Sequence, residues 1–287
     1  MAKIKPWSEE TEKLLSTMPQ AGDTHLWFAR VASRLANVLD KDDTTHILLT
    51  CASWVTHRRI PDREIHDAVA FGYGEVQPTN SKKYVWPEPK PSLIGEVLGE
   101  ADPICDHTQS TGLKPKEVLT HLFPAYSIIC ISMNEFKAES YIWPDDLTEI
   151  DLSVYQYIVP NPLVELTGTN QQGQPSVRCQ SNILERRFVV VEFDTEPDKV
   201  NQAKLLGFLS ESIPCAMVVD SAGKSLHGWY PVYNLTESQA AAFFGKAVAL
   251  GADQSVYDKC KLVRMPGGLR DGARRQRIVY YDEEALP

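Results

Sequence analysis

The stretch Phe188–Asp194 reads Phe-Val-Val-Val-Glu-Phe-Asp and brings two carboxylates to the end of an apolar run. The three valines are β-branched and favour a β-strand. Side chains alternate along a strand, so Glu192 and Asp194 are predicted to share one face. Two carboxylates so close repel each other unless a cation lies between them, and Mg²⁺ or Mn²⁺ prefers such oxygen ligands. The stretch therefore predicts a divalent-cation site. The alternative is a strand that leaves the core with one carboxylate solvated and the other capping a turn.

The composition is that of an ordinary soluble globular protein of 287 residues, with 43% hydrophobic and 23% charged residues. The sequence contains no apolar run long enough for a membrane span and no apolar segment typical of a signal peptide. Its six cysteines are scattered, with no Cys-x-x-Cys pair. A cytoplasmic protein with reduced thiols is therefore the expectation.

The net charge of −9 argues at first against a nucleic-acid-binding protein. Nearly all of that charge lies in residues 1–160, however, and residues 161–287 are close to neutral. This second part contains a basic cluster that consists of Lys259, Lys261, Arg264, Arg270, Arg274, Arg275 and Arg277. Such a cluster suits contacts with phosphates, and the alternative is a solvated charged surface.

The chain divides into three segments by pattern. Residues 1–75 have helical periodicity and predict a helical accessory domain, in which Ser8 and Pro61 mark helix starts. Residues 76–154 begin with a proline-rich linker and then predict the start of an α/β core, which residues 155–287 complete. Within this core we expect helices at about 199–210 and 237–250, and strands at about 126–131, 216–220, 226–233 and 277–281.

The strand at 216–220 is followed by a turn of small residues and a second strand, which is typical of a β-hairpin. Its Gly223-Lys224-Ser225 tripeptide is not a P-loop, because the first glycine of that motif is missing and no helix follows. The turn instead offers backbone N–H groups, Lys224, Ser225 and His227 to an anion. For His227 the alternative is a histidine packed on a strand.

Three segments in this order resemble the archaeo-eukaryotic primase superfamily of primase-polymerases. They are Val-Val-Glu-Phe-Asp at 190–194, Ser-Ala-Gly-Lys-Ser-Leu-His-Gly-Trp at 221–229, and Val-Arg-Met-Pro-Gly-Gly-Leu-Arg at 263–270, preceded by Asp253. The resemblance extends over about residues 155–281 and is best to plasmid- and phage-type members. It implies an α+β fold whose catalytic core at 155–287 is an RRM-like antiparallel sheet with flanking helices, beside the N-terminal helical domain.

The resemblance also implies roles for individual residues. Glu192, Asp194 and Asp253 would bind two Mg²⁺ or Mn²⁺ ions, with Asp258 as an alternative to Asp253. Many members have Asp at the position of Glu192. Residues with nucleotide-binding roles would be Lys224, Ser225, His227 and Arg264. The template strand would contact Lys259, Lys261, Arg270, Arg274 and Arg275.

The expected function is that of a DNA primase or DNA polymerase, a DNA-templated nucleotidyltransferase that synthesises or extends primers for a plasmid, phage or mobile element. Its expected partners are single-stranded DNA and NTP or dNTP. A replicative helicase would be a further partner, because the sequence contains no helicase motif. The first alternative is a catalytically inactive single-stranded DNA-binding module. A metal-dependent nuclease or other phosphotransferase is a second, although no residue is evident that would activate water.

Overall fold

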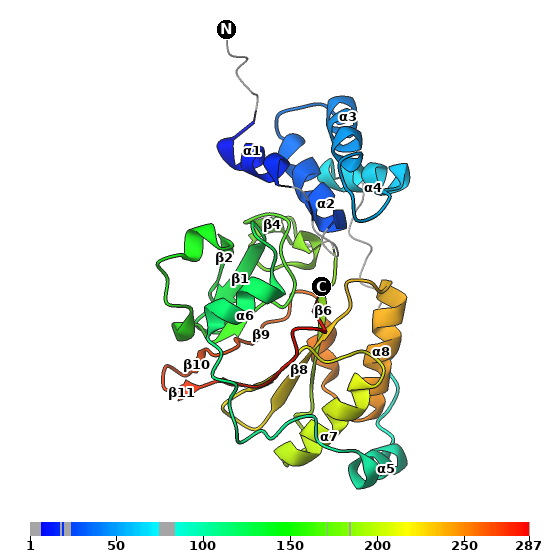
Figure 1. Cartoon of the computed structure of the whole chain (residues 1–287), viewed down its shortest axis with the longest axis vertical. Coiled ribbons are helices and arrows are strands. Elements are labelled where there is room, and N and C mark those ends of the chain that lie inside the picture. Colours follow the sequence, from blue (N-terminus) through cyan, green and yellow to red (C-terminus); the bar gives the residue numbers. More distant parts are fainter. Residues whose placement is uncertain are drawn as a thin grey trace.

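The computed structural model describes residues 7–17, 19, 24–74, 84–170, 172–183 and 185–286, which form a mixed structure of helices and antiparallel sheets (Figure 1). The α+β class expected from the sequence is confirmed. Residues 76–83 of the predicted linker lie outside the described residues. In the described part of the chain, no helix is long and apolar enough to cross a membrane.

Four helices at the N-terminal end pack around a core of their own. They are α1 (Glu9–Ser16), α2 (Thr24–Leu35), α3 (Lys41–Ala52) and α4 (Asp62–Gly72). The hydroxyl of Ser8 caps α1 by accepting a hydrogen bond from the backbone N–H of Thr11. Fully buried Phe28 and Leu48 belong to the shared core. These helices form the upper part of Figure 1, and the Lys13–Asp145 ion pair (2.9 Å) links them to the rest of the molecule.

The first sheet has the strand order β2-β1-β3-β9. Its strands are β1 (Ile128–Ser132), β2 (Ala138–Ile142), β3 (Tyr157–Ile158) and β9 (Val263–Arg264). In the β3–β9 pair, Tyr157 lies opposite Arg264, so the chain returns to this sheet after more than a hundred residues. Both β1 and β2 come from the 76–154 segment and lie in one sheet with strands of the 155–287 segment.

The second sheet has the order β12-β7-β8-β6 and carries the first two sequence motifs. Its strands are β6 (Phe188–Glu192), β7 (Met217–Asp220), β8 (Leu226–Pro231) and β12 (Arg277–Tyr281). The two long helices that follow β6 and β8 are α7 (Lys199–Ser210) and α8 (Glu237–Ala249). All of these elements lie within two residues of their predicted bounds.

The alternation of β6 places its residues in two different cores. Phe188 and Val190 pack with Ile129 of β1 in the core between the two sheets. Val189 and Val191 pack on the other face, in the core that contains α7 and α8. Glu192 has the parity of Val190 and therefore lies on the face that is turned toward the first sheet.

A close approach at Gly228 sets α7 against the second sheet. A Cβ at this position in β8 would lie 2.6 Å from Cδ2 of Leu206, a distance that side chains do not tolerate. Tyr230, two residues further along β8, donates its hydroxyl to the Leu206 carbonyl at 2.8 Å. The glycine therefore lets the helix lie directly on the strand.

The remaining elements are short. They are α5 (Pro91–Glu100), α6 (Pro115–Leu122), β4 (Gly168–Thr169), β5 (Pro175–Ser176), β10 (Leu269–Arg270), β11 (Arg274–Arg275) and the 3₁₀ turns η1 (Asp145–Leu147), η2 (Leu152–Val154), η3 (Gln180–Asn182) and η4 (Gln254–Tyr257).

Candidate active site

Glu192 and His227 form the centre of the candidate site. They are directly paired across β6 and β8, and Nε2 of His227 lies 2.9 Å from Oε2 of Glu192. The side chains are only 5% exposed for His227 and 14% for Glu192. Two motifs that are 35 residues apart in sequence thus meet at the end of the second sheet, in the register that the strands impose.

The carboxyl of Glu192 is held in its ionised form. Burial alone would raise its pKa, but the charge and hydrogen bond of His227 and the positive charges of Arg264 and Lys261 lower it to about 2. The site therefore presents a buried anion at neutral pH, which is the form that binds a metal ion.

Asp194 lies beyond the end of β6, so strand alternation, on which the predicted shared face with Glu192 is based, does not apply to it. β6 ends at Glu192, and a turn closed by the hydrogen bond from Glu196 N to Phe193 O (3.1 Å) follows. Strand alternation does not reach Asp194. Its Oδ2 lies 3.2 Å from Nζ of Lys224, which also donates to the Asp194 carbonyl at 3.2 Å. The first carboxylate thus meets His227 and the second meets Lys224.

Asp253 is placed beside Glu192 by the backbone. Its N–H donates to the Glu192 carbonyl at 3.0 Å, immediately before η4. Its carboxylate caps η4 by accepting from the N–H and hydroxyl of Ser255 at 2.9 and 2.8 Å. Asp258, the alternative from the sequence, accepts instead from the N–H of Cys260 at 3.0 Å. Of the two, Asp253 is the one attached to the end of β6.

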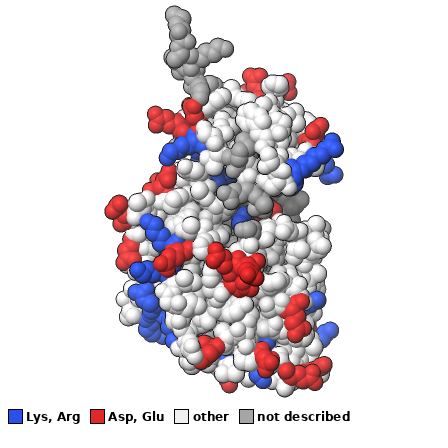
Figure 2. Space-filling view, viewed as in Figure 1, with Lys and Arg blue, Asp and Glu red and all other residues white. Residues whose placement is uncertain are grey.

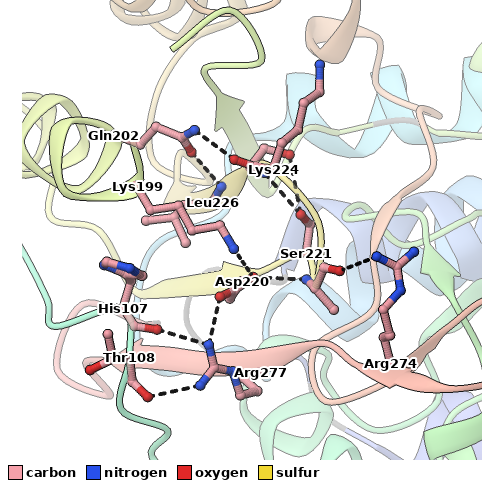
Figure 3. A network of polar contacts seen from close by, with 12 residues as sticks. His107, Thr108, Lys199, Gln202, Asp220, Ser221, Lys224, Leu226, Arg274 and Arg277 are labelled. Atoms are coloured by element: carbon pink, nitrogen blue, oxygen red, sulfur yellow. Dashed lines mark hydrogen bonds and ion pairs between the residues drawn. The ribbon is translucent and has the colours of Figure 1, made fainter. Parts of the chain in front are cut away.

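The hairpin that carries Lys224 is fixed by Gln202 of α7, which is fully buried (Figure 3). The amide nitrogen of Gln202 donates to the carbonyls of Glu196 at 2.6 Å and Lys224 at 2.9 Å. Its oxygen accepts from Leu226 N at 2.7 Å. One side chain therefore holds both the turn after Asp194 and the hairpin before His227. Sequence reasoning missed Gln202, because a glutamine in a helix carries no local sign of such a role.

A buried ion network also stabilises the hairpin that carries Lys224. Asp220, only 2% exposed, lies 2.8 Å from Nζ of Lys199 and 2.9 Å from Nη2 of Arg277 (Figure 3). It also accepts from Ala222 N at 2.9 Å, at the start of the turn. Arg277, predicted as part of the basic cluster, also donates to the carbonyl of Thr108 at 2.9 Å. This arginine is thus a structural residue.

Ser225 and Arg264, both predicted to bind nucleotide, lie near the Glu192–His227 pair. The Ser225 hydroxyl is buried, 3.5 Å from Nε2 of His227. The Arg264 guanidinium stacks over the Tyr157 ring at 4.6 Å. Among the described residues, Nη1 of Arg264 and Nδ1 of His227 are buried without a hydrogen-bond partner. Buried polar atoms normally have partners, so two such nitrogens near one carboxylate indicate a place for further acceptors.

The predicted template-binding residues separate into two groups. Lys259 pairs with Glu237 of α8 at 3.6 Å, and Lys261 donates to the Ser255 hydroxyl at 3.1 Å, next to Asp253. The arginines Arg270, Arg274 and Arg275 instead form the hairpin β10–β11. Arg270 and Arg274 reach the hairpin at 221–225 by donating to the carbonyls of Ser221 (3.4 Å) and Ala222 (3.1 Å). The second group thus adjoins Lys224.

The carboxylates have the chemistry of a divalent-cation site, but their present partners are protein groups. In the part of the chain that the structure describes, no three His, Cys, Asp or Glu side chains converge closely enough to hold a metal ion as they stand. A cation at Asp194 would compete with Lys224, whose ammonium group has the same preference for the carboxylate.

Comparison with known proteins gives one loose structural similarity. No family model matches the sequence, and no curated protein matches it either. Among solved structures, the chain is similar to the AEP domain of the primase-polymerase of cyanophage S-2L. The TM-score is 0.39 and the identity 16%, over 63% of this chain and 93% of that chain. A similarity of this size is too low to assign roles to individual residues. The description of the candidate site therefore rests on the geometry of this structure alone.

Proposed function

We propose that the protein is a DNA-templated nucleotidyltransferase of the primase-polymerase type, which synthesises or extends primers. The convergence of the motifs at one end of the second sheet is the observation that carries this proposal. Glu192 meets His227 at 2.9 Å, and Asp253 is bonded to the Glu192 backbone at 3.0 Å. Carboxylates that can bind metal ions thus lie next to basic groups that can bind phosphates. Nucleotidyl transfer from a nucleoside triphosphate requires both. The antiparallel sheet with α7 and α8 on one face supports the RRM-like assignment of this core.

Glu192, Asp194 and Asp253 are the residues that would hold Mg²⁺ or Mn²⁺. The fit rests on the donor set, which consists of carboxylate oxygens, and on the low pKa of Glu192. When bound, two such ions supply charge neutralisation at the attacking and leaving oxygens. In the structure, Glu192 contacts His227 and Asp194 contacts Lys224.

The basic groups would bind and orient the triphosphate. Lys224 is 65% exposed at its side chain and lies at the turn of a hairpin that Gln202 and Asp220 hold in place. His227 and Arg264 each have a nitrogen without a partner in the described structure. Prepositioned hydrogen-bond donors and cations of this kind cost little reorganisation when a polyanion arrives. The basic hairpin β10–β11 would then contact the template, and a helicase would act as a separate partner.

One observation favours the second candidate, a single-stranded DNA-binding module without catalysis. Asp253 already satisfies both carboxylate oxygens with Ser255, at 2.9 and 2.8 Å, as a helix-capping residue does. If this is its whole role, only two carboxylates remain for cations. The two candidates differ in whether nucleotides are incorporated, not in whether DNA is bound.

The test is nucleotide incorporation on unprimed and primed single-stranded DNA with Mg²⁺ or Mn²⁺. Wild type is compared with Asp194→Ala and His227→Ala, and with Asp67→Ala, which removes an exposed carboxylate on α4. We expect products from wild type and Asp67→Ala, and a loss of about 100-fold or more in the two site variants. Products on primed DNA alone would identify a polymerase without initiation. Binding of DNA without any product from wild type would replace the proposal by the binding module.

A further inference from the structure

Phe136 is displayed to solvent at the turn between β1 and β2. Its side chain is 95% exposed, and Met133 in the same turn is 56% exposed. Single apolar residues on a surface are common, but a nearly fully exposed phenylalanine contributes nothing to the core. The other apolar residue with similar exposure, Val85 at 96%, lies two residues after a segment that the structure does not describe. The exposure of Phe136 therefore calls for an explanation of its own.

The turn is held rigidly by hydrogen bonds. Oδ1 of Asn134 accepts from the backbone N–H groups of Phe136 and Lys137, both at 2.9 Å. The Ser132 hydroxyl donates across the turn to the Lys137 carbonyl at 2.5 Å. Because these hydrogen bonds fix the backbone of the turn, binding through Phe136 would cost little ordering of the backbone.

Gln156 joins this turn to the basic hairpin β10–β11. Its backbone N–H donates to the Ser132 carbonyl at 3.0 Å, and its side-chain oxygen accepts from Asp271 N at 2.6 Å. Gln156 is itself buried, at 7% exposure. The apolar turn and the hairpin therefore lie at one edge of the first sheet and are fixed relative to each other.

The hairpin supplies positive charge at this edge. Figure 2 shows Lys and Arg side chains gathered over the place of β10 and β11, at the lower left of that face. The side chain of Arg274 is 56% exposed, and its Nη2 forms an ion pair with Oδ2 of Asp271 at 2.7 Å. Arg275 is exposed, and its charge helps to lower the pKa of Asp151, after the larger effect of the hydrogen bonds from Ser153. Asp151 in turn caps η2, which ends at half-exposed Val154.

We propose that this edge is a binding surface for single-stranded nucleic acid, in which Phe136 stacks on a base and Arg274 and Arg275 contact the flanking phosphates. Met133 and Val154 would extend the apolar contact. Exposed aromatic rings combined with arginines are the elements by which proteins bind single strands without reading sequence. Identifying the bound strand as the template rests on the proposed function. The surface adjoins the candidate site, because Arg274 also donates to the Ala222 carbonyl of the hairpin that carries Lys224.

The test measures binding of a fluorescein-labelled oligothymidine of about 20 nucleotides by anisotropy, in EDTA and without nucleotide. Phe136→Ala is expected to weaken binding about 5-fold or more, the effect of one lost stacked base. Phe136→Trp should bind as wild type does, whereas Phe136→Leu should bind as weakly as Phe136→Ala. Val85→Ala, a matched exposed apolar position on the segment that packs against α8, should be unchanged.

The charged part of the surface is tested by salt. Arg275→Gln should make the slope of log affinity against log salt shallower by about 0.7, and Phe136→Ala should leave the slope as it is. Equal binding by Phe136→Ala and Val85→Ala, or full binding by Phe136→Leu, would overturn the stacking role. Because no nucleotide or divalent cation is present, these results hold whether or not wild type incorporates nucleotides, so the two proposals can fail separately.

Discussion

Oε2 of Glu192 and Nε2 of His227 lie 2.9 Å apart, on residues that face each other across adjacent antiparallel strands. The register of β6 and β8 enforces this contact, because Glu192 is the last residue of β6 and its partner in β8 is His227. The strand pairing of the sheet therefore brings these two side chains into contact, and the same contact forms the centre of the candidate site.

His227→Ala should destabilise the protein by about 3 kcal/mol, because it leaves the buried Glu192 carboxylate without its closest partner. The double variant with Glu192→Gln should recover part of this loss, since no buried charge then remains. Unfolding in urea at neutral pH measures the four free energies of the cycle. Strictly additive effects would show that the two side chains are not energetically coupled.

Divalent cations should stabilise the folded protein through the carboxylates. In a titration with Mn²⁺, the unfolding free energy of wild type should rise by about 2.7 kcal/mol when the free ion reaches about 100 times its dissociation constant. Asp194→Ala should lose this rise, whereas Asp67→Ala on α4 should keep it. Thermal unfolding with and without EDTA gives the result independently of any activity. An equal rise in all three proteins would place the bound ion elsewhere.

Gln202→Leu should cost about 3 kcal/mol, because three hydrogen bonds to backbone groups are lost at a fully buried position. It should also raise KM for nucleotide, since the hairpin that carries Lys224 loses its support. The matched control is Asn201→Leu, one residue earlier on α7, whose amide donates to the Glu196 side chain at 3.3 Å. A stable Gln202→Leu protein with normal KM would remove Gln202 from the support of the site.

Asp220 should make stability depend on pH in the acid range. Burial raises its pKa, but the hydrogen bond and charge of Lys199 and the hydrogen bonds from Arg277 and the Ala222 N–H outweigh it, so the pKa is below the usual value of 3.8. Its stabilising contribution is therefore complete above that value and is lost as pH falls through the lower pKa of the folded state. Urea unfolding of wild type and Asp220→Asn should differ at pH 7 and converge in acid. Parallel pH curves would contradict this assignment.

Two glycine-to-alanine variants should act in opposite directions. Gly228→Ala is expected to cost about 1–3 kcal/mol, because the new Cβ would lie 2.6 Å from Leu206 Cδ2 and push α7 away from β8. Gly245→Ala, inside α8, meets nothing within 4 Å and should stabilise by about 0.5–1 kcal/mol through helix propensity. Denaturant midpoints of the two variants test the packing of α7 and α8 separately. A neutral Gly228→Ala would mean that α7 can shift without cost.

The amino-acid sequence by itself determined the local elements and singled out the candidate site residues. Helix α7 occupies the predicted Lys199–Ser210, and its Asp198 cap is a local signal for the helix start. Motif order and spacing likewise selected Glu192, Asp194, His227 and Asp253. Sequence patterns of this kind indicate the local conformation of a residue and its interactions with neighbours a few positions away.

Only the tertiary structure decided the partners of these residues. The pairing of β3 with β9, the Gln202 contacts with both motifs and the Asp220–Arg277 ion pair each join residues far apart in the chain. The same holds for Asp194, which meets Lys224 because β6 ends two residues earlier. A hydrogen bond depends on distance and direction in space, and these are set by how the two sheets and α7 pack. Packing of this kind depends on the whole chain, so no local pattern encodes it.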